Sequence, residues 1–235
     1  VYTRRRVDVE KYALNVFGRF DWKLLREIMD TSVWTMLQLF IAVGIWFGFF
    51  LAVEHLGEQP LAVVNIIRSV SNISFMMFSA FATVTSSLVS NLIGAGHSDQ
   101  VLKLIRRTAG LAFIGSGAFL VIFALFPNPI LRIFTDSAVL IDATRETMYA
   151  IVINTMIQTG AYIVYNAVSG TGNTRVALLI ELIATVVYGV AIYIVVIVLR
   201  SSVALCWLCD STYALTIGLA SFLYLWSGRW KNRRV

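Results

Sequence analysis

The sequence contains a stretch of 30 residues without Asp, Glu, Lys or Arg, SVSNISFMMFSAFATVTSSLVSNLIGAGHS, between Ser69 and Ser98. A helix needs about 20 apolar residues to cross the roughly 30 Å hydrocarbon core of a bilayer. Other uncharged stretches of 18 residues or more lie at Thr31–Val53, Thr108–Leu131, Thr147–Thr174, Leu182–Leu199 and Ser211–Gly228. The chain therefore predicts six transmembrane helices.

The composition of the whole chain agrees with a membrane protein. Of its 235 residues, 58% are hydrophobic and 14% are charged, and the mean hydropathy is +0.78. A soluble domain carries about 25% charged residues, so an ordinary soluble enzyme, a disordered chain and a disulfide-rich secreted domain are excluded. Helices satisfy their own backbone hydrogen bonds in lipid, and the stretches lack the alternation of barrel strands. We expect an all-α, polytopic six-helix bundle.

The basic residues predict the orientation of this bundle. Six spans place both termini on one side of the membrane, and that side carries 15 of the 19 Lys and Arg residues. Cytoplasmic segments are enriched in Lys and Arg, so we expect both termini in the cytoplasm and the spans in the cytoplasmic membrane. The net charge of +6 is then a signal of topology, and we expect no nucleic-acid partner.

The expected boundaries follow from these stretches and from the residues that flank them. Residues 1–30 carry mixed charge and are amphipathic, with Asp21 as a helix N-cap, which favours a helix along the cytoplasmic surface. Residues 229–235 form a basic cytoplasmic tail. Between these two segments, the lobe at 31–228 has expected spans at about 31–53, 60–95, 108–127, 147–170, 175–199 and 203–228.

Polar side chains at membrane depth are costly, and they are therefore candidates for function. The second span carries a stripe at helical spacing: Asn65, Ser69, Asn72, Met76, Ser79, Thr83, Ser86 and Ser90. Small residues of this kind either pack against a neighbouring helix or line an aqueous cavity. Asn65 and Asn72 are larger than packing alone requires, and both interpretations remain open.

The fourth span places polar residues near the middle of the membrane. Gln158, Tyr162 and Tyr165 share one face, with Asn154 and Asn166 nearby. Substrate sites of transporters lie near the midplane, which favours a cavity over an interhelical hydrogen bond for Gln158. In the first span, Gln38 stands among apolar neighbours. The candidate cavity residues are therefore Gln38, Asn65, Asn72, Gln158, Tyr162 and Tyr165.

Three charged residues lie within the spans and need partners. Arg68 and Asp210 each lie about eight residues, or ~12 Å, from the outer surface, so we expect them to meet as an ion pair or a gate. Glu181 is a candidate titratable group that lies nearer the opposite surface. Its expected partners are Arg175 and Arg107.

No motif in the sequence indicates a catalytic site. Cys206 and Cys209 lie in an apolar helix without two further zinc ligands, so buried thiols are the expected interpretation. His55 and His97 have no second ligand at metal spacing, and no Ser/His/Asp or Cys/His set is present. We expect a protein that is not an enzyme and has no resident cofactor or metal.

Two short motifs and their spacing resemble a known family. The sequence VSNLIGAG at residues 89–96 is similar to the motif that closes this helix in MATE transporters, the multidrug and toxic compound extrusion family. The sequence VSGTGNTR at residues 168–175 resembles the second hallmark of that family. The turn at 56–58 and the segment SGRWK at 227–231 resemble bacterial members. The resemblance covers nearly the whole chain, as the C-terminal six-helix lobe of a twelve-helix protein.

This resemblance implies secondary active efflux of cationic or amphipathic organic compounds, in exchange for Na⁺ or H⁺. The implied partners are the small-molecule substrate, the lipid bilayer and an N-terminal six-helix lobe, which residues 1–30 would join to this one. Many sodium-coupled members carry an aspartate at the position of Gln158 and a glutamate at or beside Gln38. Since both residues are amides here, we expect the coupling ion to bind outside this lobe.

Two alternative functions stay open at this stage. A lipid-linked saccharide flippase of the same superfamily would line its cavity with several cations, and the spans contain one buried cation, Arg68. A membrane scaffold subunit that does not transport would need no aqueous cavity, and Gln158 and Asn72 would then be packed in a dry interface.

Overall fold

The computed structural model describes residues 21–231. The expected surface segment at 1–30 and the tail at 229–235 therefore lie partly outside the described residues. Residues 21–231 contain helices and no strands, and six of the helices are long and apolar enough to cross a membrane, as predicted. These six are α2 (Trp22–Glu54), α3 (Glu58–Gly94), α4 (Val101–Leu125, after the 3₁₀ turn Ser98–Gln100), α6 (Ala138–Gly170), α7 (Thr174–Ile192, continued by a π-helix at Tyr193–Val198) and α8 (Val203–Trp226); the short α5 covers Pro127–Leu131.

The chain divides into two units, Val1–Val33 and Trp34–Val235. In the first unit, residues 21–33 are described and are helical from Trp22 onward. The Oδ1 atom of Asp21 accepts hydrogen bonds from the backbone N–H groups of Lys23 at 2.9 Å and Leu24 at 3.1 Å. Asp21 thus acts as an N-cap, as the sequence predicts. The position of this segment on a membrane surface stays a prediction.

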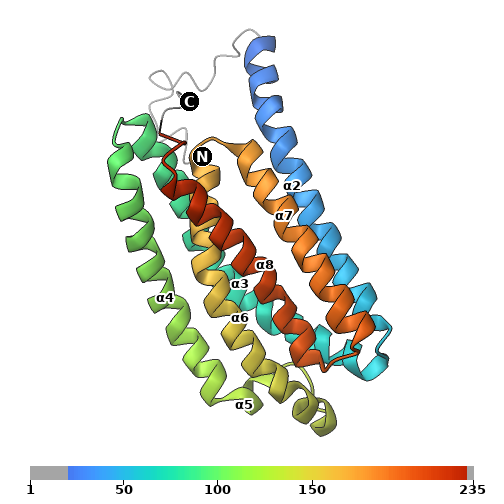
Figure 1. The fold of residues 1–235 in the computed structure, drawn as a ribbon. Helices are drawn as coiled ribbons and strands as arrows, with labels where there is room; N and C mark the ends of the chain where they lie inside the picture. The colour runs from blue at the N-terminus through green and yellow to red at the C-terminus, as the bar shows by residue number, and fades with distance from the viewer. Residues whose placement is uncertain (1–20, 232–235) are drawn as a thin grey trace, which may run out of the picture. The chain divides into compact units, whose positions relative to one another are not determined.

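Helix α6 forms the centre of the second unit. It packs along α3, α4 and α8, while α7 packs mainly against α8 (Figure 1). Half of the membrane-spanning stretch of α6 is buried inside the protein. This stretch includes the polar residues Asn154 and Gln158. The neighbours of α6 therefore shield these polar residues from lipid.

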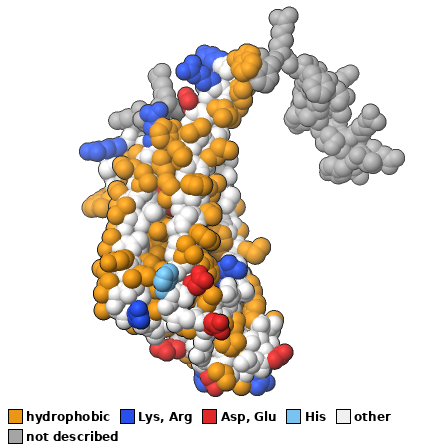
Figure 2. Space-filling model, turned by 90° about the vertical axis from the view of Figure 1, so that its right-hand side faces the viewer, with side chains coloured by type: hydrophobic (Ala, Val, Ile, Leu, Met, Phe, Trp, Pro, Cys, Tyr) orange, Lys and Arg blue, Asp and Glu red, His pale blue; other side chains and the backbone are white. Residues whose placement is uncertain are grey.

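Large apolar side chains cover the outside of the helices. Among them are Phe40, Ile114, Val186 and Leu219, with exposed fractions of 78, 73, 65 and 61%. Figure 2 shows hydrophobic side chains along the helices of one face, with charged side chains gathered toward the helix ends. Soluble monomers do not expose apolar surface of this extent, whereas a bilayer solvates it. The protein is therefore a multi-pass membrane protein.

Helix α4 differs from its predicted form. The sequence predicts a span that begins at about Thr108, but the structure contains one continuous helix from Val101. No Gly or Pro interrupts residues 101–109, so nothing in the local sequence breaks the helix there. The span ends before Pro127, where proline begins α5.

Close contacts between backbones hold α6 against two neighbours. A methyl group at Gly170 would lie 2.5 Å from the carbonyl oxygen of Ser86 on α3, and one at Gly218 of α8 would lie 2.9 Å from Cβ of Ala161. The Ser90 hydroxyl donates to the Gly170 carbonyl at 2.8 Å. The polar stripe of α3 therefore serves packing at its C-terminal end, as one of the two interpretations predicts.

We expect Gly170→Ala to destabilise the protein by about 1–3 kcal/mol, because the new methyl group overlaps backbone that cannot move aside independently. The thermal midpoint in detergent measures this effect. Gly110→Ala on α4 is the matched control, since nothing lies within 4 Å of its new methyl group. That control should keep or slightly raise the midpoint, because alanine favours helix. Equal midpoints for both variants would contradict the tight contact.

Candidate functional site

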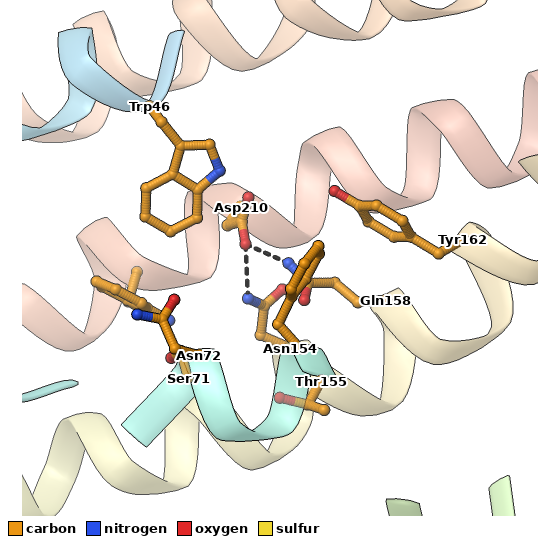
Figure 3. Close-up of a pocket in the computed structure, with 10 residues that line it drawn as sticks. Trp46, Ser71, Asn72, Asn154, Thr155, Gln158, Tyr162 and Asp210 are labelled. Atoms are coloured by element: carbon orange, nitrogen blue, oxygen red, sulfur yellow. Dashed lines mark hydrogen bonds between the residues drawn. The ribbon is translucent and has the colours of Figure 1, made fainter. Parts of the chain in front are cut away.

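A cavity of about 170 Å³ lies among α2, α3, α6 and α8 (Figure 3). Aromatic side chains form part of its wall, and amide, hydroxyl and carboxyl groups form the rest. Trp46 meets Trp207 edge to face with ring centroids 6.0 Å apart. The lining residues are Trp46, Ser71, Asn72, Phe75, Asn154, Thr155, Gln158, Tyr162, Trp207 and Asp210. We call this the Asp210 cavity.

Two amides of α6 hold the carboxylate of Asp210. Asn154 donates from Nδ2 to Oδ2 of Asp210 at 2.9 Å, and Gln158 donates from Nε2 to the same oxygen. These amides are four residues apart, so they lie on one face of α6. Asp210 is 7% exposed, and no Lys, Arg or His forms an ion pair with it within residues 21–231. The cavity wall therefore contains a carboxyl group that two amide donors contact, with no basic side chain paired to it among residues 21–231.

The hydrogen bonds continue along α8. The Ser211 hydroxyl donates to Oδ1 of Asn154 at 2.9 Å, so the Asn154 amide bridges two adjacent residues of α8. Asn154 is 3% exposed, and both ends of its side chain are occupied. This bridge fixes the orientation of the amide, with its donor toward Asp210.

The expected pair of Arg68 and Asp210 is not formed, and that prediction is wrong. The Arg68 guanidinium lies over the Phe50 ring, 5.0 Å from its centroid, and contributes to no cavity wall that includes Asp210. Helix α8 packs along α6 and touches α3 little, so Asp210 meets the amides of α6 instead. Counting residues gave a similar depth for the two charges but no information about which helices are neighbours.

A second, more open cavity of about 500 Å³ lies beside the first, and we call it the Glu181 cavity. Glu181 is 2% exposed, and its carboxyl accepts a hydrogen bond from the Tyr213 hydroxyl. Gln38 of α2 donates from Nε2 to the Tyr165 hydroxyl. The lining residues are Gln38, Leu39, Ala42, Val43, Trp46, Phe75, Ser79, Ala82, Thr83, Tyr162, Tyr165, Asn166, Glu181 and Tyr213.

The expected basic partners of Glu181 do not contact it. The Arg175 guanidinium lies over the Trp34 ring at 5.4 Å, and Arg107 lines a groove between α3 and α4. Six residues separate Arg175 from Glu181, which is about one and two-thirds turns of helix, so their side chains leave α7 on different faces. The predictions of both partners are wrong. The prediction that the coupling ion binds outside this lobe stays a prediction, although Glu181 and Asp210 are two carboxyl groups of this lobe that pair with no basic side chain among residues 21–231.

The predicted cavity residues lie in the Asp210 cavity, in the Glu181 cavity or in neither. Asn72, Gln158 and Tyr162 line the Asp210 cavity, whereas Gln38, Tyr165 and again Tyr162 line the Glu181 cavity. Asn65 lines neither cavity, and its amide donates to the Leu61 carbonyl of its own helix at 3.1 Å. The middle of the α3 stripe thus faces the cavities and its C-terminal end packs on α6. Each interpretation of the stripe holds for a different part.

Three site residues on α8 were missed from the sequence: Trp207, Ser211 and Tyr213. Trp207 and Ser211 lie three residues before and one residue after Asp210, and Tyr213 lies three residues after it. A residue and its third neighbour share a helix face. This spacing around the only acid of the last span could have identified the face, had Asp210 not been assigned to Arg68.

Comparisons with known proteins agree with this architecture. The MatE family model matches residues 35–195. The probable multidrug resistance protein NorM of Thermotoga maritima is 26% identical over 221 residues, which cover 91% of this chain and 46% of that protein. The chain thus spans about half the length of the curated relative that it matches.

Solved structures show the same fold. A crystal structure of MATE in the bent conformation superposes with a TM-score of 0.75 at 16% identity, covering 86% of this chain and 45% of that one. A MOP superfamily transporter from Pyrococcus furiosus superposes with a TM-score of 0.71 at 17% identity, covering 86% and 45%. The predicted fold, a six-helix membrane bundle that corresponds to about half of a MATE-type protein, is confirmed.

Proposed function

Because the chain belongs to the MatE family, we propose that it forms one six-helix lobe of a secondary active efflux transporter. In this proposal a second lobe completes the transporter, since the chain spans about half of its relatives. The transporter exports cationic or amphipathic organic compounds in exchange for Na⁺ or H⁺. It lies in the bacterial cytoplasmic membrane, with the basic ends of the helices in the cytoplasm.

The observation that carries this proposal is the charge of the Asp210 cavity. A buried carboxylate with no counter-charge among residues 21–231 attracts a cation more strongly than a solvated carboxylate does. The rings of Trp46, Trp207 and Tyr162 add faces that attract organic cations, at about 0.5–2 kcal/mol for each well-placed ring. A cavity of about 170 Å³ admits one such cationic group.

The same lining argues against the alternative functions. A flippase for an anionic lipid-linked saccharide needs cations around its cargo, and in the described part of the chain no Lys, Arg or His lines either cavity. A scaffold subunit needs no cavity, yet Gln158 and Asn72 lie in the wall of one. Efflux of organic cations is the function that uses these features together.

A dye series tests the function. The complete transporter, meaning this chain with its second lobe, is reconstituted into liposomes with an imposed H⁺ or Na⁺ gradient. We expect gradient-driven transport of the cationic dye rhodamine 6G and no transport of the anionic dye fluorescein, because the Asp210 carboxylate repels an anion. Fluorescence quenching follows the uptake. Transport of the anion, or no gradient-driven transport of any cationic dye, would contradict the proposal.

A further inference from the structure

The Glu181 carboxyl is not used by the proposed binding of an organic cation at Asp210. It lies on α7, in a different cavity, and is 2% exposed. The polar groups that face it are the hydroxyls of Tyr213 on α8 and Tyr165 on α6. Ser79 and Thr83 of α3 and Gln38 of α2 line the same cavity and carry no charge.

No positive side chain in residues 21–231 compensates for an ionised Glu181. Arg175, the basic residue of its own helix, lies over Trp34. A lone carboxylate at membrane depth is costly unless a cation or a proton occupies it. Glu181 therefore needs a mobile positive partner when no substrate is present.

A proton fits this site better than a metal ion does. Hard cations take several oxygen ligands, often from more than one carboxylate. Residues 21–231 contain no group of three or more His, Cys, Asp or Glu side chains that could hold a metal ion. The Tyr213 hydroxyl directs its hydrogen at Glu181 and so occupies a lone pair that a metal ion would need.

The two carboxyl sites are close enough to influence each other. Trp46, Phe75 and Tyr162 contribute to the walls of both cavities, so a single layer of side chains separates them. Two unit charges roughly 10 Å apart, at an effective dielectric constant of about 20, change each other's binding about tenfold.

We infer that Glu181 is the proton-exchange site of this lobe, and that a proton on Glu181 and an organic cation beside Asp210 exclude one another. This inference rests on the proposed function. When the cation enters the Asp210 cavity, its charge favours the ionised form of Glu181, and the carboxyl releases its proton to water in the Glu181 cavity. When Glu181 takes up a proton again, the Asp210 cavity loses part of its attraction for the cation. Binding linkage makes the two effects equal in size.

Calorimetry of the complete transporter in detergent tests this exchange, with tetraphenylphosphonium as the organic cation. Titrations in buffers of different ionisation enthalpy give the number of protons released for each cation bound. We expect the wild type to release protons. We expect Glu181→Gln to release none, to bind with an affinity within about tenfold of wild type, and to lose the rise in affinity with pH. Glu146→Gln, an exposed acid of α6, is the control and should behave as wild type.

A second variant guards against a folding defect in Glu181→Gln. Tyr213→Phe keeps the ring and the carboxyl but removes the hydroxyl that donates to Glu181. We expect the pH midpoint of proton release to move upward, because the carboxylate loses a donor that favours its charged form. A midpoint equal to that of wild type would overturn the assignment.

The remaining outcomes separate this inference from the proposed function. Glu181→Gln that releases as many protons as wild type overturns the inference and moves the exchange to Asp210 or to the second lobe. The wild type could instead bind tetraphenylphosphonium without releasing protons, with NaCl but not KCl competing for binding. That result overturns the inference, because sodium rather than a proton would then be the exchanged ion. A wild-type transporter that does not bind tetraphenylphosphonium at all overturns the proposed function, and the inference with it.

Discussion

Asp210→Asn is expected to lower the affinity of the complete transporter for tetraphenylphosphonium by at least about 100-fold. The substitution keeps the size of the side chain and removes its charge. A hydrogen bond or contact to a buried charge contributes about 1.5–3 kcal/mol, and the Coulomb attraction within a cavity that excludes water adds to it. Among residues 21–231, Asp210 is the only charged residue that lines this cavity, so no other described residue in its wall takes over the role.

Calorimetry or quenching of tryptophan fluorescence measures this loss of affinity. Asp142→Asn, an exposed acid on α6, is the matched control and should leave the affinity unchanged. Thermal midpoints of both variants show whether each one folds. An affinity of Asp210→Asn within threefold of wild type, in a folded protein, would show that the organic cation does not bind at Asp210.

Asn154→Leu is expected to cost about 3–5 kcal/mol of stability. Asn154 donates to Asp210 and accepts from Ser211, and it is 3% exposed. Leucine has a similar size and can do neither. The substitution leaves a buried carboxylate with the Gln158 amide as its remaining side-chain donor, and it leaves the Ser211 hydroxyl without its acceptor. Removing one partner from a buried charge has costs of this size.

A double-mutant cycle separates this effect from a simple packing defect. In Asn154→Leu/Asp210→Leu the uncompensated charge is gone, so the double variant should be more stable than Asn154→Leu alone. Asn166→Leu is the matched control on the same helix, because its amide donates only to the Tyr162 carbonyl of α6, at 2.9 Å. Additive losses in the cycle, measured as thermal midpoints in detergent, would contradict the coupling of Asn154 to Asp210.

The fold could be predicted because membrane-spanning helices depend on the length of uncharged stretches, which can be read along the sequence. A helix that crosses lipid needs about 20 residues without charge, and six such stretches are visible along the chain. The helix ends were less certain. Helix α4 begins at Val101 rather than at about Thr108, because no helix breaker lies between these residues, and hydropathy does not show this.

The sequence indicated how deep each site residue lies in the membrane, but not which neighbouring helix its side chain contacts. The rise of a helix gives the depth of each residue in the membrane, and this correctly indicated that Gln158 and Tyr162 lie within the span. Depth does not say which helices are neighbours. Arg68 and Asp210 have similar depths, but α6 takes the contacts of Asp210.

The two amides illustrate the same limit. The positions of Gln38 and Gln158 carry no charge, which predicted a lobe without a cation site. In the structure, Asp210 of α8 contributes a carboxylate to Gln158, and Glu181 of α7 lies in the same cavity as Gln38. A carboxyl group therefore accompanies each amide, one hydrogen-bonded to Gln158 and one in the cavity that Gln38 lines. Both carboxyl groups come from other helices, so a search along one helix does not find them.

The backbone contacts of α6 also determine where this lobe is stiff. At Gly170 and Gly218 there is no side chain between α6 and its neighbours, so α3, α6 and α8 cannot slide past one another without a steric overlap. From Trp34 onward, α2 contacts this block through long side chains such as Trp46 and Phe49, without a backbone contact of the kind seen at Gly170. Both cavities lie at this contact between α2 and the other three helices. If α2 moves relative to the other helices, we therefore expect both cavities to widen on the side of α2. The Asp210 carboxyl should stay hydrogen-bonded to its two amides on α6.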